Sequence, residues 1–330
     1  MRVKLSEVGR RMRAAVALSA GVLAVSCGGG QQVSPFIASR VVSFGDETSL
    51  IVDLHGDSNG SKYTVNATVS SDDSTVVCGL SPIWNQSVAA SYGLVFPECN
   101  LASVAVTAPT SRIRATLNAV AADLVAQIDA QQADAPLGAG DLVTVLVGEN
   151  DVIAQYLQYP VLSEVVLTAN VQAAGVEAGQ QVNRLANLGA KVILSTIPDV
   201  GITPFAVAER MAHADTDRAA LLTRLSQSFN TALRSTISND GRRIGLVLLD
   251  ELVSSLGANP GLDGFTNTTD AVCDLTLSML TPPSSLDCTS QTLVVNGSTA
   301  YFWADDRHLS ASAQSVLGST AITRSRNNPF

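Results

Sequence analysis

Short apolar segments alternate with longer amphipathic segments along most of this chain, and this alternation limits the fold more than any other feature. The segments with the length and β-branched content of buried strands are residues 40–44, 142–147, 191–197 and 244–249. The segments with helical periodicity between them are residues 111–131, 163–188 and 215–237. Apolar strands that alternate with helices indicate a parallel sheet covered on both faces. We therefore expect one α/β domain with three layers, α/β/α, around a central parallel sheet.

The composition narrows the class of protein. Hydrophobic residues make up 46% of the chain and charged residues only 15%, which excludes an intrinsically disordered chain. The formal net charge is −9, although basic residues gather in the first 26 positions. The remainder is therefore still more acidic, and such a surface repels phosphate backbones. We expect no nucleic-acid partner.

The amino terminus has the pattern of an export signal. Five basic residues precede a short apolar run, which is too short to cross a bilayer. The run ends in Leu-Ala-Val-Ser before Cys27, which resembles a bacterial lipobox. We expect a signal over residues 1–26, a lipid-anchored tether over 27–39 and a domain over 40–330, in a lipoprotein of the periplasm or outer membrane. The alternative is an ordinary cleavable signal with an incidental cysteine.

The other four cysteines are Cys78, Cys99, Cys273 and Cys288, an even number in a chain bound for an oxidising compartment. Three pairings are possible, and proximity in the sequence favours Cys78–Cys99 and Cys273–Cys288. A metal site is the competing interpretation. No histidine lies near any of these cysteines and no Cys-x-x-Cys spacing occurs, so we predict disulfides and no metal.

One histidine has a partner at a useful spacing. Asp305 lies three residues before His308, which is close enough in a turn for its carboxylate to accept a hydrogen bond from the imidazole. Such a bond fixes the tautomer and stabilises the imidazolium. Ser310 is a plausible N-cap for the last helix. His55 and His213 have no partner of this kind and are interpreted as surface residues.

Polar residues follow two of the predicted strands, where ligands of such sheets bind. Gly45-Asp46 follows the first strand, Gly148-Glu149-Asn150-Asp151 follows the second, and Asp305-x-x-His308 lies near the end. In this order they resemble the SGNH/GDSL family of esterases and lipases, with its GDS(L), GxND and DxxH signatures. The segment 188–204 is similar to a further family stretch, Leu-Gly-Ala before a strand and Pro-x-x-Gly-x-x-Pro after it.

The resemblance implies a flavodoxin-like SGNH fold and assigns roles to the matching residues. Asn150 and Gly148 become donors of an oxyanion hole. His308 becomes the general base and then the general acid, with Asp305 as its orienting partner. The implied reaction is acyl transfer to water through a serine ester, without a metal or organic cofactor.

The pattern breaks at the nucleophile, because Glu47 stands where the family has serine. A two-residue bulge would bring Ser49 to this place, and Ser49 is therefore our predicted nucleophile, with Thr48 second. Gly56-Asp57-Ser58 has turn composition and no apolar strand before it, so we set it aside. The family's second block, with its oxyanion-hole glycine, would fall at residues 100–102, where the next residue is Ser103 instead.

Three functions remain open. The first is an extracytoplasmic ester hydrolase acting on small acyl or acetyl esters. The second is a catalytically impaired relative that serves as a binding or envelope-structural lipoprotein, favoured by Glu47. The third is transacylation of a glycan or lipid. In each case the expected partners are a small ester or an acylated glycan or lipid, and a membrane held through lipidated Cys27.

Overall fold

The computed structural model describes residues 35–70, 75–102, 104–238, 241–259, 261 and 264–327. A compact unit spans Phe36–Phe330. It thus takes in residues 36–39, which the sequence analysis placed in the tether. The predicted signal and Cys27 lie outside the described residues. Within the described part of the chain, no helix has the length and apolarity needed to cross a membrane.

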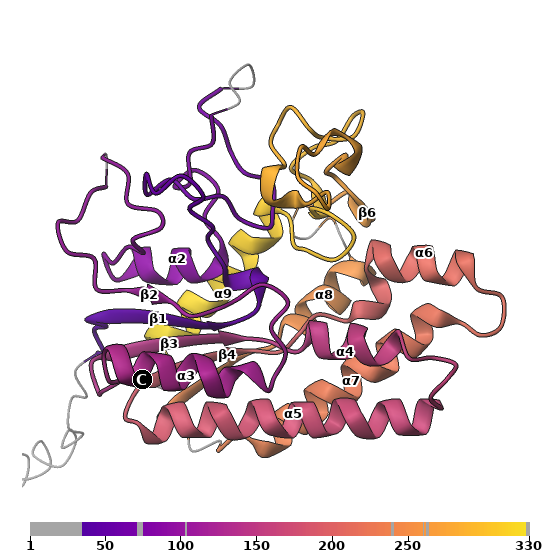
Figure 1. Ribbon diagram of the computed structural model, residues 1–330, viewed down its shortest axis with the longest axis horizontal. Helices are drawn as coiled ribbons and strands as arrows, with labels where there is room; N and C mark the ends of the chain where they lie inside the picture. The colour runs from indigo at the N-terminus through magenta and orange to yellow at the C-terminus, as the bar shows by residue number, and fades with distance from the viewer. Residues whose placement is uncertain are drawn as a thin grey trace, which may run out of the picture. The chain divides into compact units, whose positions relative to one another are not determined.

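A five-stranded parallel sheet forms the centre of this unit (Figure 1). Its strands, in spatial order, are β2 (Arg112–Ile113), β1 (Arg40–Gly45), β3 (Asp141–Leu146), β4 (Lys191–Ser195) and β5 (Ile244–Val247). The order reverses direction at β1, which lies between β2 and β3. Ligands of such sheets bind at the carboxyl ends of the strands that flank this reversal.

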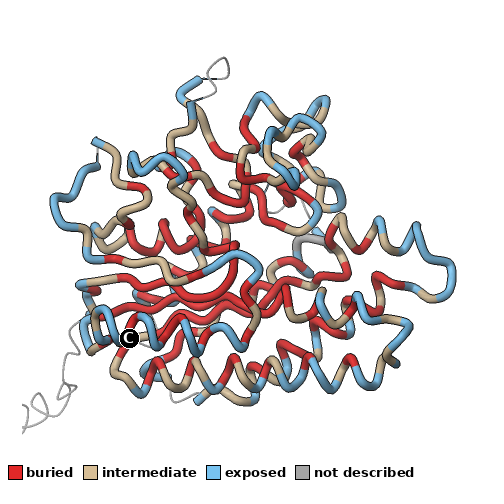
Figure 2. Tube along the Cα trace, viewed as in Figure 1, coloured by how far each residue is buried: buried red, intermediate tan, exposed pale blue. Residues whose placement is uncertain are grey.

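Helices cover both faces of the sheet, which confirms the predicted α/β/α fold. One face packs on α3 (Asp123–Asp134), α4 (Glu149–Tyr156), α5 (Glu164–Asn187) and α7 (Arg218–Thr236). The other packs on α2 (Trp84–Ser91), α8 (Leu249–Ala258) and α9 (Ala311–Asn327). Successive residues of a strand point to opposite faces, so Val42 enters the first core and Val41 the second. The strands are buried over most of their length (Figure 2).

Most predicted elements are present, and one is wrong. Residues 163–188 and 215–237 form α5 and α7, and the four predicted strands are β1, β3, β4 and β5. The helix predicted over 111–131 begins only at Asp123, because β2 and a loop precede it. β2 is a two-residue strand at the edge of the sheet. Just after it, the backbone amides of Arg114 and Ala115 donate to the Ser43 carbonyl of β1. A strand of this length has no periodicity to read.

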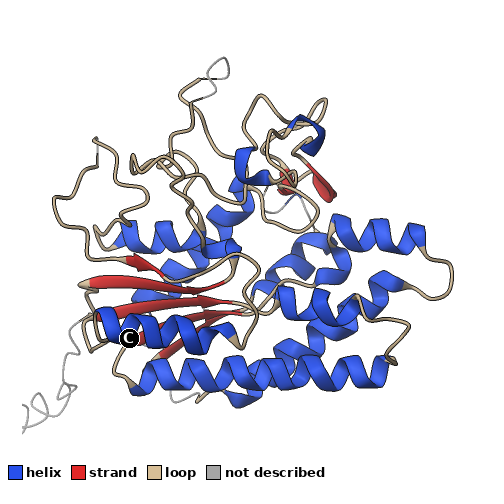
Figure 3. Cartoon of the chain, in the orientation of Figure 1, coloured by secondary structure: helices blue, strands red, loops and turns tan. Residues whose placement is uncertain are grey.

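Two largely irregular segments lie beyond the sheet, described over residues 50–70 and 75–80 and over residues 272–300 (Figure 3). Cys78 of the first segment pairs with Cys99, and Cys273 and Cys288 pair within the second, which confirms the pairing favoured by proximity. Asn66 joins the two segments, since its amide donates to the Cys288 carbonyl at 2.8 Å. The short elements of this region are η4 (Leu275–Leu277), η5 (Ser285–Asp287), β6 (Asn267–Ala271) and β7 (Tyr301–Trp303).

The remaining elements lie in the segments that follow β1 and β4. They are η1 (Glu47–Ser49) after β1, η2 (Val200–Ile202) after β4, and α6 (Pro204–Ala212). Helix α9 begins after Ser310, whose hydroxyl accepts from the amide of Ala313 at 3.3 Å, so the predicted N-cap is confirmed. The turn between β7 and α9 carries Asp305 and His308.

Candidate functional site

Asp305 and His308 form a tightly bonded pair. Nδ1 of His308 lies 2.7 Å from Oδ2 of Asp305, and the backbone amide of His308 donates to Oδ1, also at 2.7 Å. The Ser285 hydroxyl donates to Oδ2 as well. Ser285 was not predicted, because it comes from η5 within the loop that the Cys273–Cys288 disulfide closes. The pairing of Asp305 with His308 is as the spacing predicted.

This pair is buried and charged. Burial alone would lower the pKa of His308, but the adjacent Asp305 carboxylate raises it well above its usual value. Burial alone would raise the pKa of Asp305, but the charge and hydrogen bonds of His308 hold it well below its usual range. The pair therefore rests as imidazolium and carboxylate at neutral pH.

Glu47 lies opposite this pair, directly after β1. The chain turns there through Gly45, whose φ of 121° and close approach to the Leu146 carbonyl exclude a side chain. The Asp46 carboxylate caps η1 by accepting from the Thr48 amide at 3.1 Å. This places the Glu47 carboxylate in a site where only 3% of the side chain is exposed.

The two oxygens of Glu47 have different partners. Oε1 lies 3.5 Å from Nε2 of His308 and 3.4 Å from the guanidinium of Arg307. The distance to His308 is that of an ion pair and is longer than an ordinary hydrogen bond. Burial alone would raise the pKa of Glu47, but His308 and then Arg307 lower it to about 2.

Oε2 of Glu47 accepts two hydrogen bonds from the ends of neighbouring strands. The backbone amide of Asn118, after β2, donates at 2.8 Å, and Nδ2 of Asn150, in the first turn of α4 after β3, donates at 3.1 Å. Asn150 is itself held, because Nδ2 also donates to the Ala119 carbonyl and Oδ1 accepts from Arg307 at 3.0 Å. A carboxylate oxygen thus occupies a pair of convergent donors, which is the arrangement of an oxyanion hole.

Ser49, the predicted nucleophile, points elsewhere. Its hydroxyl oxygen accepts from the indole of Trp84 at 3.0 Å, and its side chain is fully buried. The bulge that would bring it to His308 is not formed: β1 and β3 stay in register to the end of β1, and η1 begins at Glu47. Two positions further along a helical turn, Ser49 faces away from Glu47. The prediction is corrected accordingly, and Thr48 lies in the same turn without reaching the histidine.

The second family block is also misplaced in the sequence-based prediction. The side chain of Asn100 is tied to Val106 within its own loop, and Ser103 lies outside the described residues. The equivalent donor is Asn118, whose φ of 59° is one that asparagine tolerates better than most residues. The sequence did not indicate this position, because β2 is too short to be predicted. Without a predicted strand before it, Asn118 could not be recognised as a residue at the end of a strand.

Gly148 has a structural reason to be glycine. Its φ is 126°, and a Cβ there would lie 2.1 Å from the ring of Phe229. Its predicted role as an oxyanion donor stays a prediction, because among the described contacts only Asn118 and Asn150 donate to Glu47. The triplet Gly56-Asp57-Ser58 forms a turn around the carboxylate of Asp53, which accepts from all three amides.

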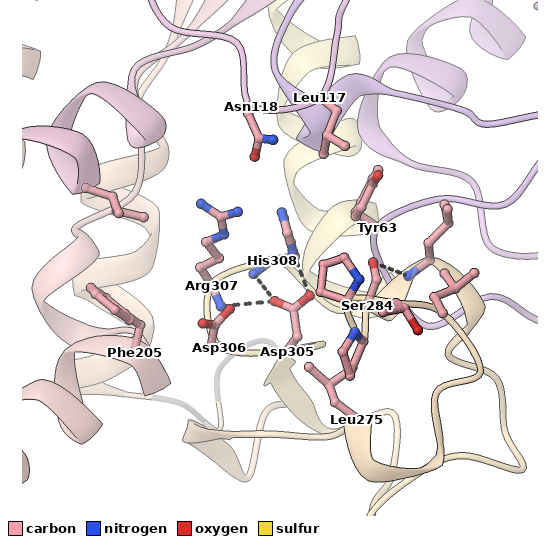
Figure 4. Close-up of a pocket in the computed structure, with 16 residues that line it drawn as sticks. Tyr63, Leu117, Asn118, Phe205, Leu275, Ser284, Asp305, Asp306, Arg307 and His308 are labelled. Carbon is pink, nitrogen blue, oxygen red and sulfur yellow. Dashed lines mark hydrogen bonds and ion pairs between the residues drawn. The ribbon is translucent and has the colours of Figure 1, made fainter. Parts of the chain in front are cut away.

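A cavity of about 550 Å³ opens beside the site. Figure 4 shows the side chains of Arg307 and His308 both pointing toward the Asn118 segment, with Asp305 beneath the imidazole. The walls are largely apolar, formed by Leu117, Ile153, Phe205, Leu275, Leu280 and Leu286. Tyr63 also lines the cavity, with its ring centroid 5.3 Å from that of His308.

Further carboxyl groups surround the site without forming a metal centre. Burial raises the pKa of Glu149 to about 7, and burial followed by the neighbouring Glu47 raises that of Asp46 well above its usual value. The guanidinium of Arg307 and then the imidazole of His308 oppose the rise in the pKa of Glu149. Within the described residues, no group of three or more His, Cys, Asp or Glu is placed to hold a metal ion.

The model of the GDSL-like lipase/acylhydrolase family matches residues 54–320. The chain belongs to this family. The family assignment points to a carboxylic ester hydrolase. The match begins after β1 and so does not include Glu47. No curated protein matches the chain.

The chain is similar to solved structures of two hydrolases. LAE5, an alpha/beta hydrolase from the metagenome of Lake Arreo, is 14% identical with a TM-score of 0.45, over 88% of this chain and 96% of that one. Axe2, an acetylxylan esterase from Geobacillus stearothermophilus, is 11% identical with a TM-score of 0.43, over 88% and 94% of the two chains.

Proposed function

We propose that this protein is an altered ester hydrolase of the family, which binds an acylated ligand in its cavity but does not turn it over through a serine ester. The observation that carries the proposal is the position of Glu47. Its carboxylate takes the place of the nucleophile and at the same time fills the donors of Asn118 and Asn150.

The cost of this arrangement for acyl ester hydrolysis can be gauged. Hydrogen bonds to a charged acceptor are each worth about 1.5–3 kcal/mol. An ester carbonyl that used the same two donors would have to displace the Glu47 carboxylate from them. This costs about 3–6 kcal/mol, which corresponds to a factor of roughly 10²–10⁴ in rate. The negative charge of Glu47 would also oppose a developing oxyanion. Attack of the carboxylate on an acyl ester would give only a mixed anhydride.

The acid–base half of the site keeps the arrangement that the family resemblance implies, so the site has changed at its nucleophile and not at its acid–base groups. His308 is oriented by Asp305, and Asn150 is held by Arg307 and the Ala119 carbonyl. A serine at position 47 would leave these groups in place and free the two donors. The apolar walls of the cavity suit the acyl part of a small ester or of an acylated glycan or lipid.

We further propose that the protein is exported and held to a membrane through lipidated Cys27, in the periplasm or at the outer membrane. Two disulfides support an oxidising compartment. Globomycin treatment of cells tests the anchor, because it blocks removal of a lipoprotein signal. Accumulation of the precursor is expected, and normal processing would contradict lipidation.

The test of the lost serine route uses p-nitrophenyl acetate and a fluorophosphonate probe on the wild type, Glu47→Ser, and Glu47→Ser with His308→Ala. We expect no serine labelling in the wild type, labelling at position 47 with turnover in Glu47→Ser, and loss of both in the double variant. Ser49→Ala is the matched control. Wild-type labelling that disappears in Ser49→Ala would overturn the proposal.

A further inference from the structure

The two oxygens of Glu47 are placed for the two halves of a covalent reaction. Oε1 faces His308 and Arg307, both of which line the cavity. Oε2 already sits on the donors of Asn118 and Asn150. If Oε1 became bonded to a carbon atom, Glu47 would carry an ester whose carbonyl oxygen lies in an oxyanion hole and whose carbonyl carbon lies beside a histidine base.

We propose that Glu47 is a catalytic nucleophile for an apolar epoxide, and that His308 then hydrolyses the ester formed on Glu47 to release a diol. The proposal rests on the proposed function in one respect, that position 47 acts as a carboxylate in place of a serine. It differs from the proposed function in the atom that is attacked, which is an sp³ carbon of the epoxide instead of the acyl carbon of an ester. A carboxylate that attacks an sp³ carbon forms an ordinary ester, whereas attack on an acyl carbon forms an anhydride.

In the first step, Oε1 of Glu47 forms a bond to a ring carbon and the carbon–oxygen bond of the epoxide breaks. The ring oxygen takes the proton that His308 holds in the resting ion pair. The products of this step are a hydroxyalkyl ester of Glu47 and a neutral imidazole. Loss of the Glu47 charge removes one of the groups that kept His308 protonated. The imidazole therefore stays neutral and can act as the base of the second step.

In the second step, Nε2 of His308 takes a proton from water, and the hydroxide attacks Cδ of Glu47. The negative charge develops on Oε2, where the amide of Asn118 and Nδ2 of Asn150 donate to it. The intermediate expels the diol oxygen, which takes the proton from His308. Glu47 then returns its own acidic proton to His308, and the resting ion pair is restored. The sum is epoxide plus water to diol.

The cavity supports this choice of electrophile. Most of its wall is apolar, which suits an apolar substrate, and it holds a second donor for the ring oxygen, beside His308, in Tyr63. The Tyr63 hydroxyl makes no hydrogen bond to any residue that the structure describes. Burial and then the Glu47 charge raise the pKa of Tyr63, so the hydroxyl stays protonated at neutral pH. Asp305 is a positioning residue in this scheme, because it orients His308 without touching the substrate.

The test uses the purified full chain and 1,2-epoxyoctane in H₂¹⁸O, with protein in excess so that each site turns over once. The first diol should contain no ¹⁸O, because its new oxygen comes from Glu47, and the peptide with Glu47 should gain one ¹⁸O. In His308→Gln the ring oxygen has to take its proton from the Tyr63 hydroxyl or from water, so the first step should be slower. The variant should then stop and accumulate the hydroxyalkyl ester on this peptide. Glu47→Gln should form neither ester nor diol, and folded Ser49→Ala should form both as the wild type does.

The outcomes separate this proposal from the proposed function. Direct incorporation of ¹⁸O into the first diol, or diol formation that Glu47→Gln retains, would overturn the covalent route. Absence of both diol and ester in wild type and His308→Gln would overturn it too, provided that Glu47→Ser hydrolyses p-nitrophenyl acetate and so reports a formed site. Serine labelling in the wild type would instead refute the proposed function.

Discussion

Replacing Glu47 by glutamine should change the stability of the protein in a pH-dependent way. Glutamine keeps the shape and an acceptor for Asn118 and Asn150 but removes the charge that faces His308 and Arg307. The pKa of Glu47 is lowered from 4.5 to about 2 in the folded protein. A depressed pKa contributes stability that is present above the unfolded value and is lost as the pH falls through the folded value.

The size of the effect follows from this shift. Each pKa unit corresponds to about 1.4 kcal/mol, so the ionised carboxylate contributes about 3 kcal/mol at pH 6. About 1 kcal/mol of this remains at pH 3. The free energy of unfolding of Glu47→Gln, measured by urea denaturation, should therefore lie below that of the wild type at pH 6. The gap should close by about 2 kcal/mol at pH 3.

Asp151→Asn is the matched control. Asp151 lies on α4, next to Asn150, and burial raises its pKa to about 6, so its charge destabilises the fold as the pH rises. The difference between wild type and Asp151→Asn should change with pH in the opposite direction. A gap for Glu47→Gln that is independent of pH, or one that widens on acidification, would refute the reasoning.

Three further predictions concern the surroundings of the site. Gly148→Ala should lose about 3 kcal/mol or more in urea denaturation, because its Cβ would overlap the ring of Phe229; an unchanged midpoint would contradict this packing. Ser49→Ala should lose about 1–3 kcal/mol by leaving a buried indole donor unpaired, and equal stability would show that the bond is not formed. Replacing Cys273 and Cys288 by serine should cost about 3 kcal/mol, and a variant as stable as wild type would argue against this disulfide.

The sequence predicted the parts of the site that depend on neighbours in the chain. Asp305 and His308 share one turn, so their spacing alone indicated the contact. Asn150 follows a strand of six buried residues, which periodicity identifies easily. The two disulfides close short loops, and proximity selected them.

The parts that failed depend on contacts between distant segments. Asn118 was hidden because β2 is two residues long and its place in the sheet comes from pairing with β1. Ser285 reaches Asp305 only through the fold of a disulfide-closed loop. The register after β1 decides between Glu47 and Ser49, and this register is set by the close contact of Gly45 with Leu146. No local pattern reports it.

The protonation of His308 tests the pairing with Glu47 most directly. In an NMR titration of ¹⁵N-labelled imidazoles, wild-type His308 should stay protonated well above its ordinary pKa, because Asp305 and then Glu47 stabilise the imidazolium. Glu47→Gln should lower this pKa. A His308 that titrates at the same pH with and without the Glu47 charge would contradict the account.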